Sequence, residues 1–309
     1  IEKEDFKKLI SRNIRKLLLK ISPVENLKDK GKNALRVLKS FTMTIPDGPE
    51  FSINVDSLLG VADSGNLTQD LIDLFISLGE TAKEHNKQVC IFVDEIQYLR
   101  EDDFSALLTA IHRLNQLELP VILMIAGLPQ IAGLAGEAKS YAERLFHYIK
   151  IDSLAQSKAK DAIKIPIEDL GVEISANAIE SILEHTGRYP FYIQAFAKVI
   201  WDDAENPISE THVNRAYEKF IQSLDEGFFK VRIDRTTGAE KKLLKSMASL
   251  GKGPYSMTEV ATRYGSQMRS ISPHRSSLMK KGLIYSPDYN KIDFTVPLFD
   301  DFIRRELKN

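Results

Sequence analysis

Two apolar runs without polar alternation constrain the fold of this chain more than any other feature. Residues 89–94 read Val-Cys-Ile-Phe-Val-Asp and are followed by Glu95, and residues 121–126 read Val-Ile-Leu-Met-Ile-Ala. Such runs are typical of strands that are covered on both faces, as in parallel sheets flanked by helices. A helical pattern over 102–116 lies between them, and parallel strands need a crossover of this kind. We therefore expect an α/β core with a parallel sheet.

Further elements are expected around these strands in a predicted core domain over 1–154. Alternation on both sides of a Pro-Asp-Gly-Pro turn predicts an inserted hairpin over 41–55, and a shorter strand is expected near 146–151. Apolar residues at helical spacing predict further helices over 2–21, 24–39 and 66–85.

The second half of the chain has a different pattern. Successive helical patterns predict an all-α module over 155–236, with helices over 155–164, 175–186, 190–204 and 209–224. Residues 237–309 predict helices over 238–250, 256–263 and around 273–281, strands over 283–286 and 291–296, and a final helix. Three helices followed by a hairpin form a winged helix, a variant of the helix-turn-helix.

Composition excludes several classes of protein. The 309 residues are 43% hydrophobic, yet no run of about 18 apolar residues predicts a membrane span. We expect the single cysteine, Cys90, to be a small buried hydrophobe in its strand, and one cysteine fits a reducing, cytoplasmic location. The six histidines have no ligand spacing, which argues against a zinc site.

Charge is distributed unevenly along the chain. Residues 237–309 hold 13 Lys/Arg against 7 Asp/Glu, whereas the rest of the chain holds 29 against 36. No acidic residue occurs over 260–287. A basic end on an acidic body suggests separate partners for the two parts, and double-stranded DNA is the candidate for the basic end.

Asp94 and Glu95 are the main candidates for chemistry. Ligands of open parallel sheets bind beyond the carboxyl ends of the strands, where these two carboxylates are expected. Apolar residues followed by Asp-Glu form the Walker B pattern of P-loop NTPases, in which the first acid holds Mg²⁺ and the second polarises the attacking water. The alternative is a solvated strand end with incidental acids.

A family resemblance extends this interpretation. The segments VCIFVDEIQYL, VILMIAGLPQI, SYAERLF and HTGRYPFYIQAFAKVIW occur in this order and precede the predicted winged helix. Over nearly all of residues 60–309 the chain resembles AAA+-related ATPases of the archaeal-ATPase and initiator type, close to the STAND NTPases. Bacterial proteins described as ATP-binding or AAA-family ATPases are the most similar. The resemblance implies an α/β P-loop NTPase core, an all-α lid, a winged helix, and Mg²⁺ and ATP as ligands.

The resemblance also implies residue roles. Asp94 matches the Mg²⁺-coordinating acid and Glu95 the catalytic base. Arg144 matches an arginine near the γ-phosphate, sometimes that of a neighbouring subunit; alternatively it is a helix-surface cation. Arg188 and Pro190 match a lid motif that contacts phosphate and adenine, although the same residues suit a joint between two helices.

Two departures from the family pattern stand out. The strand over 121–126 has no Asn, Ser or Thr after it at the position of the first sensor, and Gln130 is the nearest polar candidate. The chain also contains no Gly-x-x-x-x-Gly-Lys-Ser/Thr phosphate loop. We expect that loop to precede Ile1 in a longer protein. The alternative is a degenerate ATPase that lacks the loop.

The basic end supplies candidate DNA contacts. Lysines, arginines and hydroxyls around a recognition helix suit phosphates, and Gln267 or Arg269 suits base edges. The candidates are Gln267, Arg269, Arg275, Lys280 and Lys281. A winged helix used for protein contact or self-association is the alternative. We therefore expect an ATP-hydrolysing switch coupled to a DNA-associated winged helix, or else a non-catalytic DNA-binding or scaffold protein with a vestigial core.

Overall fold

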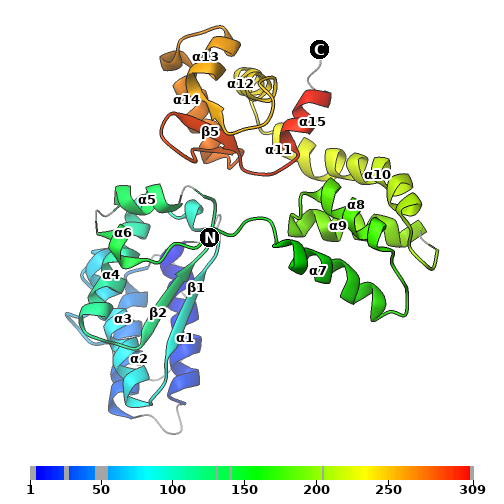
Figure 1. Ribbon diagram of the computed structural model, residues 1–309. Coiled ribbons are helices and arrows are strands. Elements are labelled where there is room, and N and C mark those ends of the chain that lie inside the picture. The colour runs from blue at the N-terminus through cyan, green and yellow to red at the C-terminus, as the bar shows by residue number, and fades with distance from the viewer. Residues whose placement is uncertain are drawn as a thin grey trace. The chain divides into compact units, whose positions relative to one another are not determined.

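The computed structural model describes residues 5–23, 28–45, 55–129, 131–138, 141–203 and 205–306. The chain divides into two compact units, Ile1–Tyr148 and Ile149–Asn309. The first unit is blue to green in Figure 1 and the second is green to red. Each unit is described separately below.

The first unit contains a two-stranded parallel sheet. β1 (Val89–Val93) pairs with β2 (Val121–Ile125), with Val89 opposite Val121, and α4 (Glu101–Gln116) connects them. The two expected strands and their helical crossover are thus confirmed. The other elements are α1 (Phe6–Ile21), α2 (Asp29–Met43), α3 (Leu67–Glu84), the 3₁₀ turn η2 (Ile96–Tyr98), α5 (Ile131–Ala138) and α6 (Ala142–Leu145).

The helices of this unit form where local signals and a buried face coincide. The Asn66 side chain caps α3 by accepting hydrogen bonds from the N–H groups of Thr68 and Gln69. Leu71 and Leu78 recur one heptad apart on the same helix, and both are fully buried. Such faces pack together into one core between the helices and one face of the sheet.

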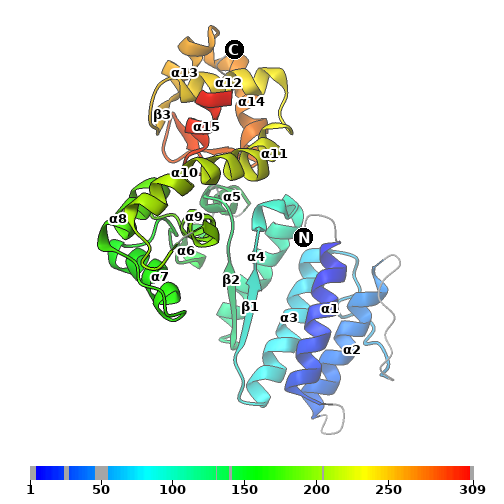
Figure 2. The ribbon, with the colours of Figure 1, turned by 90° about the vertical axis from the view of Figure 1, so that its right-hand side faces the viewer.

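In the part of the chain that the structure describes, the opposite face of the sheet is largely exposed, which corrects the prediction of strands covered on both sides. Figures 1 and 2 show α1, α2, α3 and α4 on the same side of the two strands. Phe92 is 74% exposed, and Ile122 and Met124 are about half exposed. Cys90 is exposed as well, so the expectation of a buried cysteine was wrong. Both faces of each strand are apolar, but the described residues cover only one of them.

Two other expectations for the first unit fail. Residues 41–43, expected in the first arm of a hairpin, continue α2, because Phe41 follows Leu38 and Leu35 on its buried helical face. Residues 44, 45 and 55 are not in a strand either, and the remaining part of that predicted hairpin, 46–54, lies outside the described residues. The stretch 146–151 is not a strand, since it makes no ladder pairing with β1 or β2.

The second unit is mostly helical and contains a small antiparallel sheet. The order of its strands is β3 (Tyr255–Ser256), β5 (Lys291–Phe294) and β4 (Ile284–Tyr285). Its first helices are α7 (Gln156–Glu168), α8 (Ala176–Thr186), α9 (Pro190–Asp203), α10 (Glu210–Leu224), the π-helical turn η3 (Asp225–Phe229) and α11 (Lys230–Ile233). They are followed by α12 (Gly238–Ala248), β3 (Tyr255–Ser256), α13 (Met257–Tyr264), α14 (Met268–Lys280), β4 (Ile284–Tyr285), β5 (Lys291–Phe294) and α15 (Phe299–Glu306).

One continuous hydrophobic core holds this second unit together. The Phe229 ring stacks on Phe299 at 5.5 Å and on Phe302 at 5.3 Å between ring centroids. The Tyr192 hydroxyl donates a 2.6 Å hydrogen bond to the Pro297 carbonyl oxygen. Aromatic residues of the leading helices and of the C-terminal segment therefore share one packed interior.

Two predicted helix boundaries in this unit were wrong, and each had been placed at or near a proline. α7 continues through Pro166, because Ile163 and Ile167 lie one turn apart and are both buried. α14 begins at Met268, ahead of the expected start at Pro273. A proline lacks a donor N–H, so it is a reasonable but imperfect marker of a helix boundary.

Candidate functional site

Asp94 and Glu95 lie at the carboxyl end of β1, as the sequence predicts, and both are exposed. The Asp94 carboxylate accepts a 2.8 Å hydrogen bond from the Glu95 N–H. Glu95 itself has a left-handed backbone, with φ of 54°. For a non-glycine residue this conformation is uncommon and is found where surrounding contacts hold it, often at functional sites.

Gln97 connects the Glu95 carboxylate to the loop that follows β2, and the sequence interpretation missed it. Its Nε2 donates a hydrogen bond to Glu95 Oε2, and its Oε1 accepts a 3.2 Å hydrogen bond from the Leu128 N–H. The strand ends are joined directly as well, since the Ile96 N–H donates to the Ala126 carbonyl oxygen at 3.1 Å. The sequence contained one signal for Gln97, namely an amide side chain two residues after the second acid.

Arg144 lies in the same unit, on the short helix α6, and its side chain is exposed. The turn before it is fixed to α4. The Tyr141 ring stacks on His112 at 4.6 Å, and its hydroxyl donates to Thr109 Oγ1 at 3.2 Å. The other residue predicted for this region, Gln130, lies outside the described residues.

Arg188 and Pro190 belong to the second unit, at the joint between α8 and α9. Gly187 ends α8 with a left-handed backbone at φ 56°, Arg188 follows at φ 61°, and Pro190 begins α9. The Leu154 N–H donates a 3.0 Å hydrogen bond to the Arg188 carbonyl oxygen. The backbone of this joint is therefore fixed, while the Arg188 and Pro190 side chains are exposed.

The candidate DNA contacts near α14 differ in their environments. Gln267, Arg269 and Lys280 are exposed, whereas Arg275 is partly buried. Lys281 Nζ contacts both carboxylate oxygens of Glu240, at 2.7 and 2.9 Å. Lys281 therefore already has a structural partner within the second unit.

Glu240 is a buried carboxylate with several donors around it. Burial would raise its pKa, but hydrogen bonds from Lys281, from the Ser277 side chain and from Thr237 outweigh burial and lower the pKa from 4.5 to about 2. Thr237 and Glu240 also form a reciprocal cap at the start of α12. The ion pair thus fastens the end of α14 to the start of α12.

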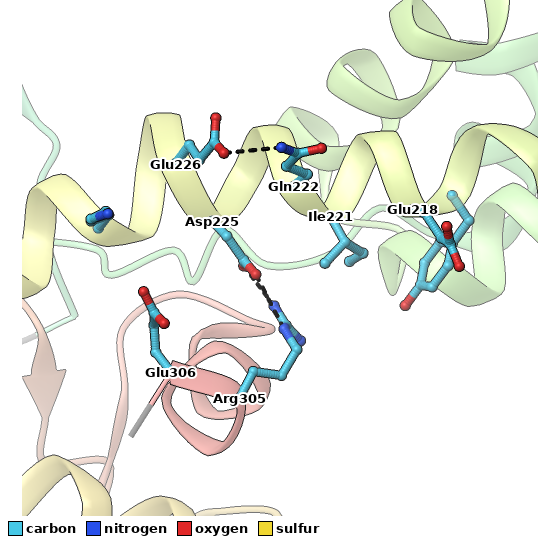
Figure 3. Close-up of a pocket in the computed structure, with 9 residues that line it drawn as sticks. Glu218, Ile221, Gln222, Asp225, Glu226, Arg305 and Glu306 are labelled. Carbon is cyan, nitrogen blue, oxygen red and sulfur yellow. Dashed lines mark hydrogen bonds and ion pairs between the residues drawn. The ribbon is translucent and has the colours of Figure 1, made fainter. Parts of the chain in front are cut away.

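A hollow of about 540 Å³ lies within the second unit and contains none of the predicted site residues. Figure 3 shows Arg305 of α15 pointing to Asp225, with which it makes hydrogen bonds of 2.6 and 3.1 Å. Four carboxylates and two cations line it: Glu218, Asp225, Glu226, Glu306, Lys230 and Arg305. This excess of negative charge disfavours a nucleotide phosphate there.

Two kinds of feature are absent from the part of the chain that the structure describes. No group of three or more His, Cys, Asp or Glu side chains is placed there to hold a metal ion by itself. None of the described helices has the length and apolar character needed to cross a membrane.

Comparison of the sequence with known proteins gives one partial match. A sequence-family model described as "Domain of unknown function (DUF8462)" matches residues 226–303, less than half of the chain. No curated protein matches.

Solved structures are more informative. The Walker-type ATPase PABY2304 of Pyrococcus abyssi is similar with a TM-score of 0.58 and 14% identity, over 95% of this chain and 79% of that one. The Holliday junction branch migration motor RuvB of Thermotoga maritima (TM-score 0.39, 17% identity, 77% and 84% coverage) and Aeropyrum pernix ORC1 in complex with DNA (0.40, 15%, 76% and 68%) are also similar. The first similarity shows that the chain has a fold like that of a Walker-type, P-loop NTPase.

Proposed function

We propose that this chain acts as an AAA+-like ATPase switch, which couples Mg-ATP binding and hydrolysis to a C-terminal winged helix. The observation that carries this proposal is the pair Asp94 and Glu95 at the carboxyl end of a parallel strand. Both side chains are exposed there. In the P-loop NTPase fold this is the edge where nucleotide binds.

The donor set at this edge suits Mg²⁺. Magnesium in nucleotide sites is usually held by one or two carboxylates together with substrate phosphates and water, so a cage of three protein ligands is not needed. The Asp94 carboxylate accepts one backbone hydrogen bond and retains further acceptor capacity. Asp94 would hold the metal, which supplies charge neutralisation at the β- and γ-phosphates when bound.

The remaining candidates would assist the transfer. Glu95 would orient the attacking water and accept its proton. Arg144, exposed on α6, would offset negative charge on the transferring phosphoryl group, in its own subunit or a neighbouring one. Arg188 and Pro190 would contact phosphate and adenine from the all-α lid over 155–236.

The phosphate loop of this proposed site is not among the 309 residues. We propose that a segment outside this sequence supplies it. The exposed sheet face supports this idea, because Phe92, Ile122 and Met124 are apolar and exposed. Parallel sheets are usually covered on both faces by helices. A further strand and helix beside β1 would cover these side chains and carry the loop.

A mutant pair tests the ATPase proposal in the natural full-length protein. Glu95→Gln should retain Mg-ATP affinity and lower the rate of hydrolysis by about 10²–10⁴-fold, the usual contribution of a general base. Glu101→Gln is the matched control, since Glu101 is also exposed and lies at the start of α4. Equal turnover by the two variants would exclude Glu95 as the base.

The absence of a phosphate loop from the given residues favours one alternative, a DNA-binding or scaffold protein whose ATPase core is vestigial. That alternative predicts that the natural full-length protein neither binds nor hydrolyses ATP. Calorimetric titration of Mg-ATP into that protein distinguishes the two functions.

For the C-terminal part we propose contact with duplex DNA. The succession of α12, α13, α14 and the β4–β5 hairpin supports a winged helix, with α14 as the recognition helix. Gln267, Arg269 and Lys280 are exposed there, and Arg275 is partly exposed. We omit Lys281 from the proposed contacts because Glu240 holds its ammonium group.

Salt dependence tests the DNA proposal. If Arg269 neutralises a phosphate, Arg269→Ala should reduce the slope of log affinity against log salt by about 0.9. If it reads a guanine edge, its loss should cost about 1–3 kcal/mol on the preferred site and less on random DNA. Lys164→Ala, on α7, is the control. Fluorescence anisotropy that detects no DNA binding at low salt, with or without ATP, would reject the proposal.

A further inference from the structure

Gln97 is the described side chain that links the two strand ends of the site. Its carboxamide donates to the Glu95 carboxylate on one side and accepts from the Leu128 N–H on the other. Glu95 follows β1, and Leu128 follows β2. One side chain therefore connects the proposed catalytic carboxylate to the loop that leads into α5.

The carboxamide of Gln97 lies close against the backbone of Gly127. A Cβ atom built on Gly127 would overlap Gln97 Oε1 and would lie 2.9 Å from Ile131 Cδ1. The loop beneath is held by two backbone hydrogen bonds, from the Ala126 N–H to the Val93 oxygen and from the Ile96 N–H to the Ala126 oxygen. Gly127 is thus the residue that makes room for the carboxamide.

We propose that Gln97 is a positioning residue, which fixes the Glu95 carboxylate relative to the loop 126–129. The inference rests on the proposed ATPase function and adds a route by which that loop acts on the base. A displacement of the loop or of α5 moves Gln97, and Gln97 moves the carboxylate. A carboxamide suits this role because it offers a donor and an acceptor on one planar group.

Substitutions at two positions test the inference in the natural full-length protein. Gln97→Met keeps the length of the side chain and removes both hydrogen bonds. Gly127→Ala leaves Gln97 and Glu95 in the sequence but displaces the carboxamide. Both should lower kcat for ATP by about 10–100-fold, as misplacement of a catalytic group does, with KM within about twofold of the wild type. Gly133→Ala is the control, because nothing lies within 4 Å of the added methyl group.

Hydrogen exchange supplies a readout that does not depend on turnover. The Leu128 amide should exchange faster in Gln97→Met than in the wild type, because its acceptor is lost. A variant with a purely structural defect would instead raise exchange throughout α4 and the sheet. Circular dichroism spectra like that of the wild type confirm that each variant is folded.

The outcomes separate this inference from the function on which it rests. If the wild type does not hydrolyse ATP, both proposals fail. If Glu95→Gln abolishes hydrolysis while Gln97→Met and Gly127→Ala retain wild-type kcat, the ATPase proposal stands and the role of Gln97 is overturned. Reduced kcat in both variants, unchanged kcat in Gly133→Ala and faster exchange at Leu128 support it.

Discussion

The ion pair between Lys281 and the buried Glu240 carboxylate gives the sharpest test of how the second unit is held together. The Glu240 side chain is 3% exposed and that of Lys281 is 30% exposed, at an N–O distance of 2.7 Å. Lys281→Met keeps most of the aliphatic chain and removes the ammonium group. The Glu240 carboxylate is then left buried with fewer donors, a change that usually destabilises a protein strongly.

The magnitude follows from the pKa of Glu240. Its displacement from 4.5 to about 2 corresponds to at most roughly 3.5 kcal/mol of stabilisation, at about 1.4 kcal/mol per unit, shared among Lys281, Ser277 and Thr237. Lys281 provides one part of the hydrogen bonding, so we expect Lys281→Met to lower the free energy of unfolding by about 2 kcal/mol at pH 7. Because the folded-state pKa is depressed, this stabilisation is present above pH 4.5 and is lost as the pH falls toward 2.

Urea unfolding followed by tryptophan fluorescence measures the effect. Trp201, the single tryptophan of the sequence, lies on α9 in the second unit and reports on its unfolding. Lys280→Met is the matched control, because Lys280 is the adjacent lysine and is exposed. The difference between the two variants should be largest at pH 7 and should shrink toward pH 2. Equal stability of the two variants at pH 7 would refute the reasoning.

Three other predictions concern stability and nucleotide affinity. Gly187→Ala should destabilise the second unit by about 1 kcal/mol in urea unfolding, because alanine is strained at a φ of 56°. Gly238→Ala, with nothing within 4 Å of the new methyl, should not. Leu107→Ala, fully buried on α4, should cost about 2–5 kcal/mol in thermal unfolding, whereas Phe92→Ala should cost less because Phe92 is 74% exposed. The 309-residue chain by itself should bind Mg-ATP weakly, since it contains no phosphate-loop motif, and calorimetric affinity in the low micromolar range would contradict this.

The sequence predicted the elements whose periodicity and burial agree. α3 and α4 combine a regular apolar stripe with a fully buried face, and both were located within one or two residues. Residues 41–43 misled the interpretation, because their alternation of apolar and hydroxyl side chains also fits a helix whose buried stripe runs through Phe41. Short patterns of this kind are decided by tertiary packing rather than by local preference.

The candidate site was predictable only in part. Asp94 and Glu95 stand out because charge directly follows an apolar run. Gln97 does not, since its significance depends on the Leu128 N–H and on the space above Gly127, both of which lie about thirty residues further along the chain. The exposure of Cys90 was not predictable either, because the apolar sequence of a strand does not show whether one or both faces of its sheet are covered.

The stacking of Phe229 on Phe299 and Phe302 bears on how the chain can be divided. A fragment cut at residue 237, where the basic C-terminal part was predicted to begin, would lose Phe229 and expose the surface of both partner rings that it covers. Exposed aromatic surface of this kind promotes self-association. The matched family model starts at residue 226, within η3, and so includes that ring. A stable C-terminal fragment should therefore start at or before Glu226, and ideally should retain α9 for the Tyr192 hydroxyl.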